Sequence, residues 1–215
     1  MKLSNLVFEC VKNVKYLDDQ NFTYNSFLSG EYDTVDDYSN SINNVFTPLN
    51  TAIHRLSDRN KIGSKVESVN FPNNENILDI SSFKNDVKRI VNVFTLNNGQ
   101  YNRCNFRELG KDKLYLSNVT GNKTIYVEYL QDIPHFKKED FYFSEGTQKD
   151  VDLRDYGIDE TMCSYIIEFV KGYLFEQISP ELANAHRIYA EQYFNDLEER
   201  TPFNQTNITN VIRYR

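Results

Sequence analysis

The chain has 215 residues, of which 40% are hydrophobic and 26% charged, and its formal net charge is −7. This length and composition lie in the ordinary globular range and allow a real core in one large domain or two small ones. The acidic net charge argues against a protein that binds nucleic acid tightly, because binding of phosphates depends on Lys and Arg. It is compatible with a surface along which DNA passes without being bound.

The cysteine pattern and the hydropathy exclude several classes of protein. Cys10, Cys104 and Cys163 are far apart, odd in number and without a Cys-x-x-Cys pair. Neither a disulfide framework nor a structural zinc site is indicated, and we expect buried thiols in a reducing compartment. Glu9 and Lys12 interrupt what would be the apolar region of a signal peptide. No run approaches about 18 apolar residues, so no membrane partner is expected.

Helical periodicity governs the first quarter of the chain. Steps of three and four predict a first helix with the apolar stripe Leu3, Leu6, Val7, Cys10, Val11, Val14 and Leu17. Residues 18–30 are polar and aromatic without a period, which predicts a loop. The period resumes over 32–56, where Pro48 is expected to kink the helix or divide it in two.

Extended segments replace helices after Lys65. Residues 87–96 are rich in β-branched and aromatic side chains, which predicts a strand. Asn97-Asn98-Gly99 follows, and Asn-Gly is a strong hairpin signal, so residues 101–109 are the expected return strand. Residues 124–130 alternate as a further strand. Together these runs predict an antiparallel β meander that ends at Pro134.

Two consecutive helices are expected near the C-terminus. Asp159 is a good N-cap for the first, and Ser179-Pro180-Glu181 is a clear restart for the second. The expected apolar stripe of the second helix is Leu182, Ala185, His186, Tyr189, Ala190, Tyr193 and Leu197. Thr201-Pro202 ends it, and a short tail follows.

The predicted fold class is α+β: a mainly helical bundle body, an inserted antiparallel β meander and an extended C-terminal tail. The expected boundaries place the N-terminal helices in 1–64 and the β insertion in 65–135. An acidic loop and the C-terminal helical hairpin occupy 136–200 and complete the bundle. Residues 201–215 form the tail, which has too few packing residues to join the core and is expected to dock on a partner.

No catalytic motif is present, and neither a cofactor nor a metal site is predicted. His54, His135 and His186 have no neighbouring Cys or Ser in a recognised frame, and a structural role is favoured for His54. Asp150, Asp152 and Asp155 invite a calcium hypothesis, but Arg154 stands at the third ligand position, which favours a solvated loop. The pairs Asp18-Asp19 and Asp36-Asp37 are interpreted as solvated faces, although carboxylates that meet only in space remain open.

Basic residues do not gather into a patch. Arg103 and Arg107 alternate with Phe106 on the expected return strand, a pattern that is able to bind single-stranded nucleic acid. The neighbouring acidic charge instead favours an edge strand or a protein interface.

The order of these parts resembles the head-to-tail adaptor proteins of tailed bacteriophages, especially the connector or tail tubular proteins of short-tailed phages and the ring proteins of crass-like phages. The resemblance covers nearly the whole chain and is one of pattern, because this family has no diagnostic motif. Its segments are 87–93, Tyr115-Leu116, 125–130, 165–168 and the Ala/Tyr helix 183–197.

The resemblance implies a structural virion protein with no catalysis and no cofactor. About twelve copies would form a homo-oligomeric ring below the portal protein, in the neck of a virion assembled in the host bacterial cytoplasm. The ring would join the capsid to downstream tail proteins and pass DNA through an acid-lined channel. The portal-binding tail residues would be Phe203, Ile208, Val211, Ile212, Arg213, Tyr214 and Arg215.

Other assignments remain open at this point. The hairpin at Asn97, Asn98 and Gly99 is a candidate contact with a neighbouring copy or the tail. A capsid cement, another tail component or a monomeric protein-binding scaffold is the alternative function, and a frayed, functionless terminus is the alternative for the tail. An enzyme would need a pocket of titratable groups with perturbed pKa values.

Overall fold

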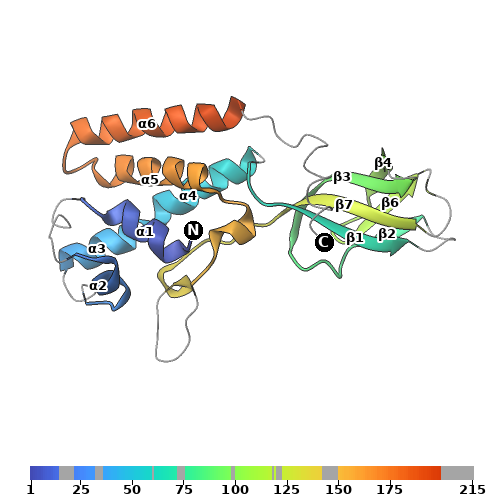
Figure 1. Cartoon of the computed structure of the whole chain (residues 1–215), viewed down its shortest axis with the longest axis horizontal. Helices are drawn as coiled ribbons and strands as arrows, with labels where there is room; N and C mark the ends of the chain where they lie inside the picture. The colour runs from blue at the N-terminus through green and yellow to red at the C-terminus, as the bar shows by residue number, and fades with distance from the viewer. Residues whose placement is uncertain are drawn as a thin grey trace. The chain divides into compact units, whose positions relative to one another are not determined.

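The computed structural model describes residues 1–14, 22–31, 36–59, 61–71, 76–97, 100–117, 119, 123–141 and 150–199. These residues form two compact units (Figure 1). The helical unit combines Met1–Ile62 with the chain that follows Ile133, and the β unit is Gly63–Asp132. The expected tail at 201–215 lies outside the described residues.

The predicted mainly helical bundle is wrong, because the chain is a mixed α and β protein. Its β unit contains two antiparallel sheets, with seven strands among the described residues. The strands also do not form a meander. The first strand of the unit pairs with the last, and no local sequence signal marks a pairing over that separation.

Helices from both parts of the chain build the helical unit. The helices are α1 (Leu3–Val11), α2 (Tyr24–Leu28), α3 (Asp36–Asn44), α4 (Phe46–Asp58), α5 (Glu160–Leu174) and α6 (Pro180–Glu199). Two short 3-10 turns, η2 (Lys138–Asp140) and η3 (Leu153–Tyr156), lie between α4 and α5 in the sequence. One hydrophobic core joins α1 to α6, so this unit depends on segments far apart in the sequence.

The stripe predicted for the first helix is confirmed over α1. Leu3, Leu6 and Val7 are fully buried in the shared core, as are the next two stripe positions. The helix ends at Val11 rather than at residue 17. Asn13 adopts φ 65, a left-handed conformation that Asn tolerates and that a helix does not continue through.

The loop expected over 18–30 contains a helix, α2, that the sequence argument missed. Thr23 caps it: its Oγ1 accepts from the backbone N–H of Ser26, and the Ser26 hydroxyl accepts from the backbone N–H of Thr23. Five residues are too few to show a helical period. Thr23 and Ser26, the capping pair, were the sequence signal for this helix. The helix places Phe27 in the core, against the ring of Phe8.

The expected division of the second helical segment is confirmed. The break falls at Val45, between α3 and α4, and Pro48 is the third residue of α4. Proline is tolerated there, because the first N–H groups of a helix have no partner within it.

A buried amide ties α4 to the segment that returns from the β unit. The Asn50 side chain donates to the Phe136 carbonyl at 2.9 Å and accepts from the Phe136 N–H at 2.8 Å. Asn50 is 8% exposed and Phe136 1%. The Asn50 side chain thus satisfies the N–H and the C=O of Phe136, a residue that belongs to no helix or strand. These two hydrogen bonds fix the path of the chain at Phe136.

The β unit is built from two sheets that share one core. Its strands are β1 (Ser64–Phe71), β2 (Ile77–Asp79), β3 (Val87–Asn97), β4 (Gln100–Arg103), β5 (Asn105–Glu108), β6 (Lys113–Ser117) and β7 (Lys123–Gln131). The strand orders are β1-β7-β3-β4 and β2-β6-β5. Alternating residues of both sheets meet in the core, as with Val127 and Tyr129 from β7 and Leu114 and Leu116 from β6.

The predicted return strand 101–109 is wrong in one respect, because it is two strands in different sheets. β4 pairs with β3, whereas β5 pairs with β6. Cys104 separates them, with its side chain in the core and its N–H bonded to the Val93 carbonyl. The hairpin itself is present as the Asn97–Gln100 pairing, although Asn98 and Gly99 lie outside the described residues.

Tyr129 places a hydroxyl at the edge of this core. The hydroxyl donates to a carboxylate oxygen of Glu67, and the amide of Asn85 lies 3.5 Å from it. Burial, followed by the Glu67 hydrogen bond, raises the pKa of Tyr129 to about 12.

Replacement of Asn50 by Ala tests the amide link. It leaves two backbone groups of buried Phe136 without their partner, so we expect the helical unit to lose about 1–3 kcal/mol of unfolding free energy. Thr51→Ala is the matched control, because Thr51 is exposed and bonds only within its own helix. Denaturant unfolding measures both, and equal stabilities would contradict the assigned role.

The pKa of Tyr129 predicts a loss of stability in alkali. The folded pKa lies above the ordinary value of 10, so below pH 10 the phenol is protonated in both states and the contribution is fully present. Above pH 10 the unfolded chain ionises first, and the stability is lost as the pH rises towards 12. Tyr129→Phe should flatten the fall in unfolding free energy between pH 10 and 12, and an unchanged slope would contradict this.

Candidate interaction surface

The histidines are placed in two locations of the helical unit. The rings of His54, on α4, and His135 lie 4.5 Å apart. His186, on α6, has its Nδ1 2.7 Å from a Glu168 carboxylate oxygen and its ring stacked on Phe175. No group of three His, Cys, Asp or Glu side chains in the described part of the chain is arranged to hold a metal ion.

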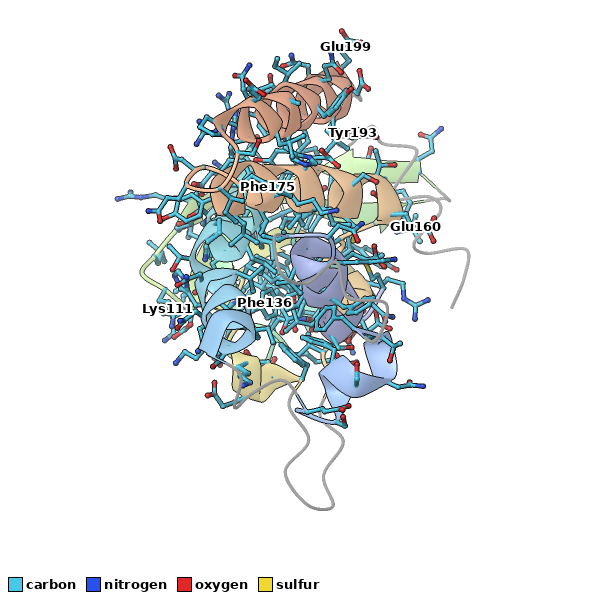
Figure 2. The ribbon with its side chains drawn as sticks, turned by 90° about the vertical axis from the view of Figure 1, so that its left-hand side faces the viewer. Lys111, Phe136, Glu160, Phe175, Tyr193 and Glu199 are labelled. Atoms are coloured by element: carbon cyan, nitrogen blue, oxygen red, sulfur yellow. The ribbon has the colours of Figure 1, made fainter. Side chains whose placement is uncertain are left out.

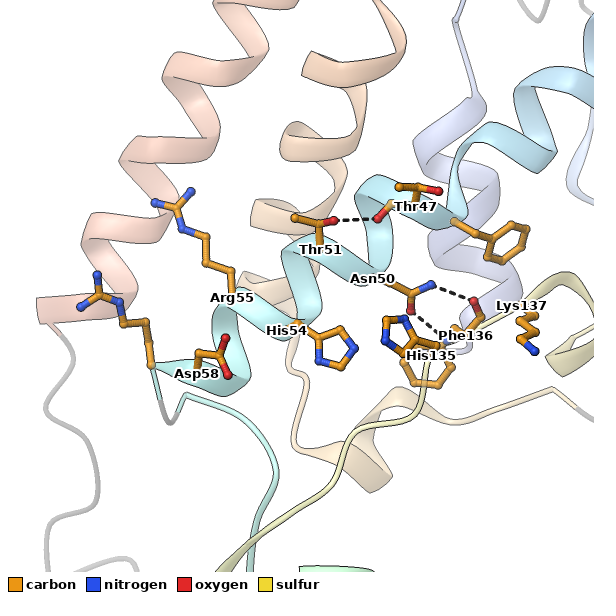
Figure 3. Close-up of a pocket in the computed structure, with 11 residues that line it drawn as sticks. Thr47, Asn50, Thr51, His54, Arg55, Asp58, His135, Phe136 and Lys137 are labelled. Carbon is orange, nitrogen blue, oxygen red and sulfur yellow. Dashed lines mark hydrogen bonds between the residues drawn. The ribbon is translucent and has the colours of Figure 1, made fainter. Parts of the chain in front are cut away.

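An open cavity of about 1110 Å³ lies beside α4 and contains the His54–His135 pair (Figure 3). Phe46 and Phe136 supply its apolar wall, and Lys137 lies at its rim. Figure 3 also shows how the Asn50 amide, by bonding Phe136, holds the neighbouring His135 next to α4. The sequence argument missed this cavity, because its residues come from segments about 80 positions apart.

The two arginines of the cavity face carboxylates of α6. Arg55 forms a two-pronged ion pair with Glu191 at 2.8 and 3.1 Å and covers the ring of Phe194 at 4.1 Å. Arg59 lies 3.5 Å from Glu198. These contacts join α4 to α6. They neutralise much of the positive charge of the cavity, which is therefore a weak candidate for an anion site.

Beneath Arg55 lies the buried phenol of Tyr165. Burial raises the pKa of Tyr165 to about 12, and the charge of Arg55 acts in the opposite direction. A phenol of this pKa remains protonated at neutral pH. Its ring contacts Phe194 at 5.2 Å, which is a packing role.

The acidic residues of the calcium hypothesis hold the N-terminus instead. The Asp150 carboxylate accepts from the Ser4 hydroxyl at 2.6 Å and from the Ser4 N–H at 3.2 Å. Asp152 caps η3, and its hydrogen bonds from Arg154 hold the pKa of that carboxyl well below its usual range. The segment that contains Asp150 and Asp152 is therefore held against the N-terminal residues, through the hydrogen bonds of Ser4 to Asp150 and the backbone bridge of Lys2 to Asp152.

The expectation of buried thiols is confirmed, because Cys10, Cys104 and Cys163 are all buried and none of them is in a disulfide bond. Burial raises the pKa of Cys163 to about 11 and raises that of Cys10 further. Thiolates are the reactive form of cysteine, so these side chains act as small hydrophobic residues.

The remaining predicted sites are only partly described. Arg103 lies on β4 and Arg107 on β5, in different sheets, so the expected Arg/aromatic strand does not exist as one surface. Asn97 ends β3, and the other two hairpin residues lie outside the described residues, as do all seven tail residues from Phe203 to Arg215.

The apolar stripe predicted for α6 is wrong at three of its seven positions. The residues that face the unit are Ala183, Ala190, Phe194 and Leu197, each at most 2% exposed. In contrast, Leu182 is 49% exposed, Tyr189 53% and Tyr193 37%. α6 therefore carries a second apolar stripe beside the buried one.

This second stripe consists of Leu182, Tyr189 and Tyr193, and we call it the hairpin face. Three further large hydrophobic side chains are exposed on the hairpin outside this stripe: Tyr173 on α5, Ile178 in the connection and Ile188 on another side of α6. α6 lies along α5 (Figure 2). Gly172 permits the close approach, because a Cβ there would lie 2.9 Å from Cγ of Arg187. Exposed apolar surface of this extent on a packed helical hairpin is typical of an interaction site.

Adjacent substitutions on α6 distinguish the buried stripe from the exposed one. Phe194→Ala removes a buried ring that contacts Tyr165 and Arg55, so it should cost about 3–5 kcal/mol of unfolding free energy. Tyr193→Ser changes an exposed side chain and should alter it by no more than about 0.5 kcal/mol. Urea unfolding of the two variants measures the difference, and similar losses would show that Tyr193 is part of the core.

Among the described residues, no helix is long and apolar enough to cross a membrane. No family model matches this chain, and no curated protein matches its sequence.

Proposed function

We propose that this chain is a structural virion protein that forms a ring below the portal and joins the capsid to the tail. The hairpin face is the observation that supports a role in assembly. A helical hairpin that packs one apolar stripe inward and leaves a second stripe, Leu182, Tyr189 and Tyr193, exposed offers a protein partner a surface to cover. A ring places a neighbouring copy beside every copy.

The charge of the chain is compatible with this role. The acidic excess of the chain lies outside the β unit, because Gly63–Asp132 contains nine Lys and Arg against eight Asp and Glu. An acidic channel wall repels phosphates, so DNA would pass through the ring without sequence-specific binding.

The portal is the proposed partner of the C-terminal tail. Ile208 to Tyr214 is short, β-capable and poor in backbone-breaking residues, so it is able to add a strand to a partner or to place apolar anchors in a groove. Its charged ends, Arg213 and Arg215, suit an acidic rim on the partner. A virion component in the neck of a phage thus combines two interaction elements, the tail and the hairpin face.

Electron microscopy of the chain mixed with portal rings of its own phage tests the proposal. A second ring on the portal is the expected image, and undecorated portals beside single copies would contradict it. Deletion of residues 201–215 should abolish decoration of the portal and leave the circular dichroism spectrum and the unfolding free energy unchanged. If the deletion unfolds the chain, the tail belongs to the core rather than to an interface.

A further inference from the structure

The β unit carries a second exposed apolar face, on the outer side of its smaller sheet. Strand pairing places Ile77, Tyr115 and Arg107 in one row across β2, β6 and β5. The next row places Asp79 opposite Lys113, and Leu109 bonds its N–H to the Lys113 carbonyl. We call these six residues the sheet face.

The side chains of the sheet face point away from the core of the β unit. Ile77 is 44% exposed, Tyr115 39% and Leu109 41%, whereas Leu78 and Leu114, on the opposite side of the same strands, are buried. Six of the ten large hydrophobic residues that are exposed in the described part of the chain belong to the hairpin face or the sheet face. Leu96 belongs to neither.

The two faces differ in charge. The hairpin face is bordered by the exposed acids Glu181, Asp196 and Glu199 of α6, and its neighbouring His186 is already bonded to Glu168. On the sheet face, hydrogen bonds from Ser81 and, to a smaller extent, the charge of Lys113 lower the pKa of the Asp79 carboxyl. Lys113 lies opposite Asp79, so Arg107 is the excess charge among the six residues. An acid-bordered apolar face and a cationic apolar face are complementary.

We propose that the hairpin face of one copy packs against the sheet face of a second copy. This inference rests on the proposed ring, and it adds which surfaces meet. A closed ring requires a heterologous contact, in which each copy offers two different surfaces. The chain has two such surfaces. Two hairpin faces would instead oppose like charges, and that isologous pair would stop at a dimer.

The exposed apolar area of the two faces supplies part of an interface between copies. A Tyr side chain that is half exposed offers roughly 100 Å². At that value, the six apolar side chains of the two faces give about 600 Å² of apolar surface, and the charged border adds to it. This is about half of the smallest interface of the usual range of about 1,200–2,000 Å², so the contact between two isolated copies is expected to be weak.

Mixing two variants tests the pairing of unlike faces. Tyr189→Asp disrupts the hairpin face, and Arg107→Glu, with Tyr115→Ser as a second variant, disrupts the sheet face. Leu96→Asp is the control, because Leu96 is 41% exposed and lies in neither face. Sedimentation velocity at up to about 1 mM measures association of the whole chain.

We expect wild type and Leu96→Asp to associate, and each face variant to raise the dissociation constant at least about tenfold. A mixture of Tyr189→Asp with Arg107→Glu should form dimers and nothing larger, because one intact hairpin face meets one intact sheet face. Variants of the hairpin face that abolish association while sheet-face variants do not would establish an isologous contact and overturn the inference, as would a wild type that remains monomeric throughout.

The outcome for the ring itself is separate. Rings that form on portals with both face variants would overturn the pairing and leave the proposed function in place. Portals that remain undecorated by wild type would remove the function, whatever the mixing experiment gives.

Discussion

The pairing of β1 with β7 is the constraint on which the whole structure depends. Ser64 opposes Leu130 at one end of the ladder, and the N–H of Gln131 bonds the Gly63 carbonyl. The chain thus enters and leaves the β unit through neighbouring strands, β1 and β7. Helices α1 to α4 and helices α5 and α6 are therefore able to share one core, although the 70 residues Gly63–Asp132 separate them in the sequence.

The returning chain is then fixed by polar contacts rather than by further strands. Asn50 completes the backbone of Phe136, and Asp150 and Asp152 hold the N-terminal residues. Arg55 and Arg59 join α4 to α6 through Glu191 and Glu198. These contacts place α6 with one stripe against the unit and the other towards solvent, which creates the hairpin face.

Sequence reasoning recovered local features and missed those that depend on long-range pairing. The α1 stripe, the division near Pro48 and the Asp159 cap follow from signals within a few residues. The β1–β7 pairing and the Asn50–Phe136 bond join residues 52 or more positions apart, where periodicity gives no information.

The error on α6 has a different origin. Steps of three and four residues fit both the buried stripe through Phe194 and the exposed stripe through Tyr193, because adjacent positions differ by only about 100° around a helix. Apolar residues alone cannot tell which stripe the unit covers. The candidate site was therefore present in the predicted element but assigned to the core.

The central claim is that the hairpin face is an interface. Hydroxyl-radical footprinting of the chain alone and mixed with the proposed portal partner measures this directly, with Tyr189 and Tyr193 as reporters. The account predicts strong labelling of these tyrosines in the isolated chain and protection in the assembly, while Tyr165, which is fully buried, remains unlabelled in both. Equal labelling of the two tyrosines in both samples would contradict it.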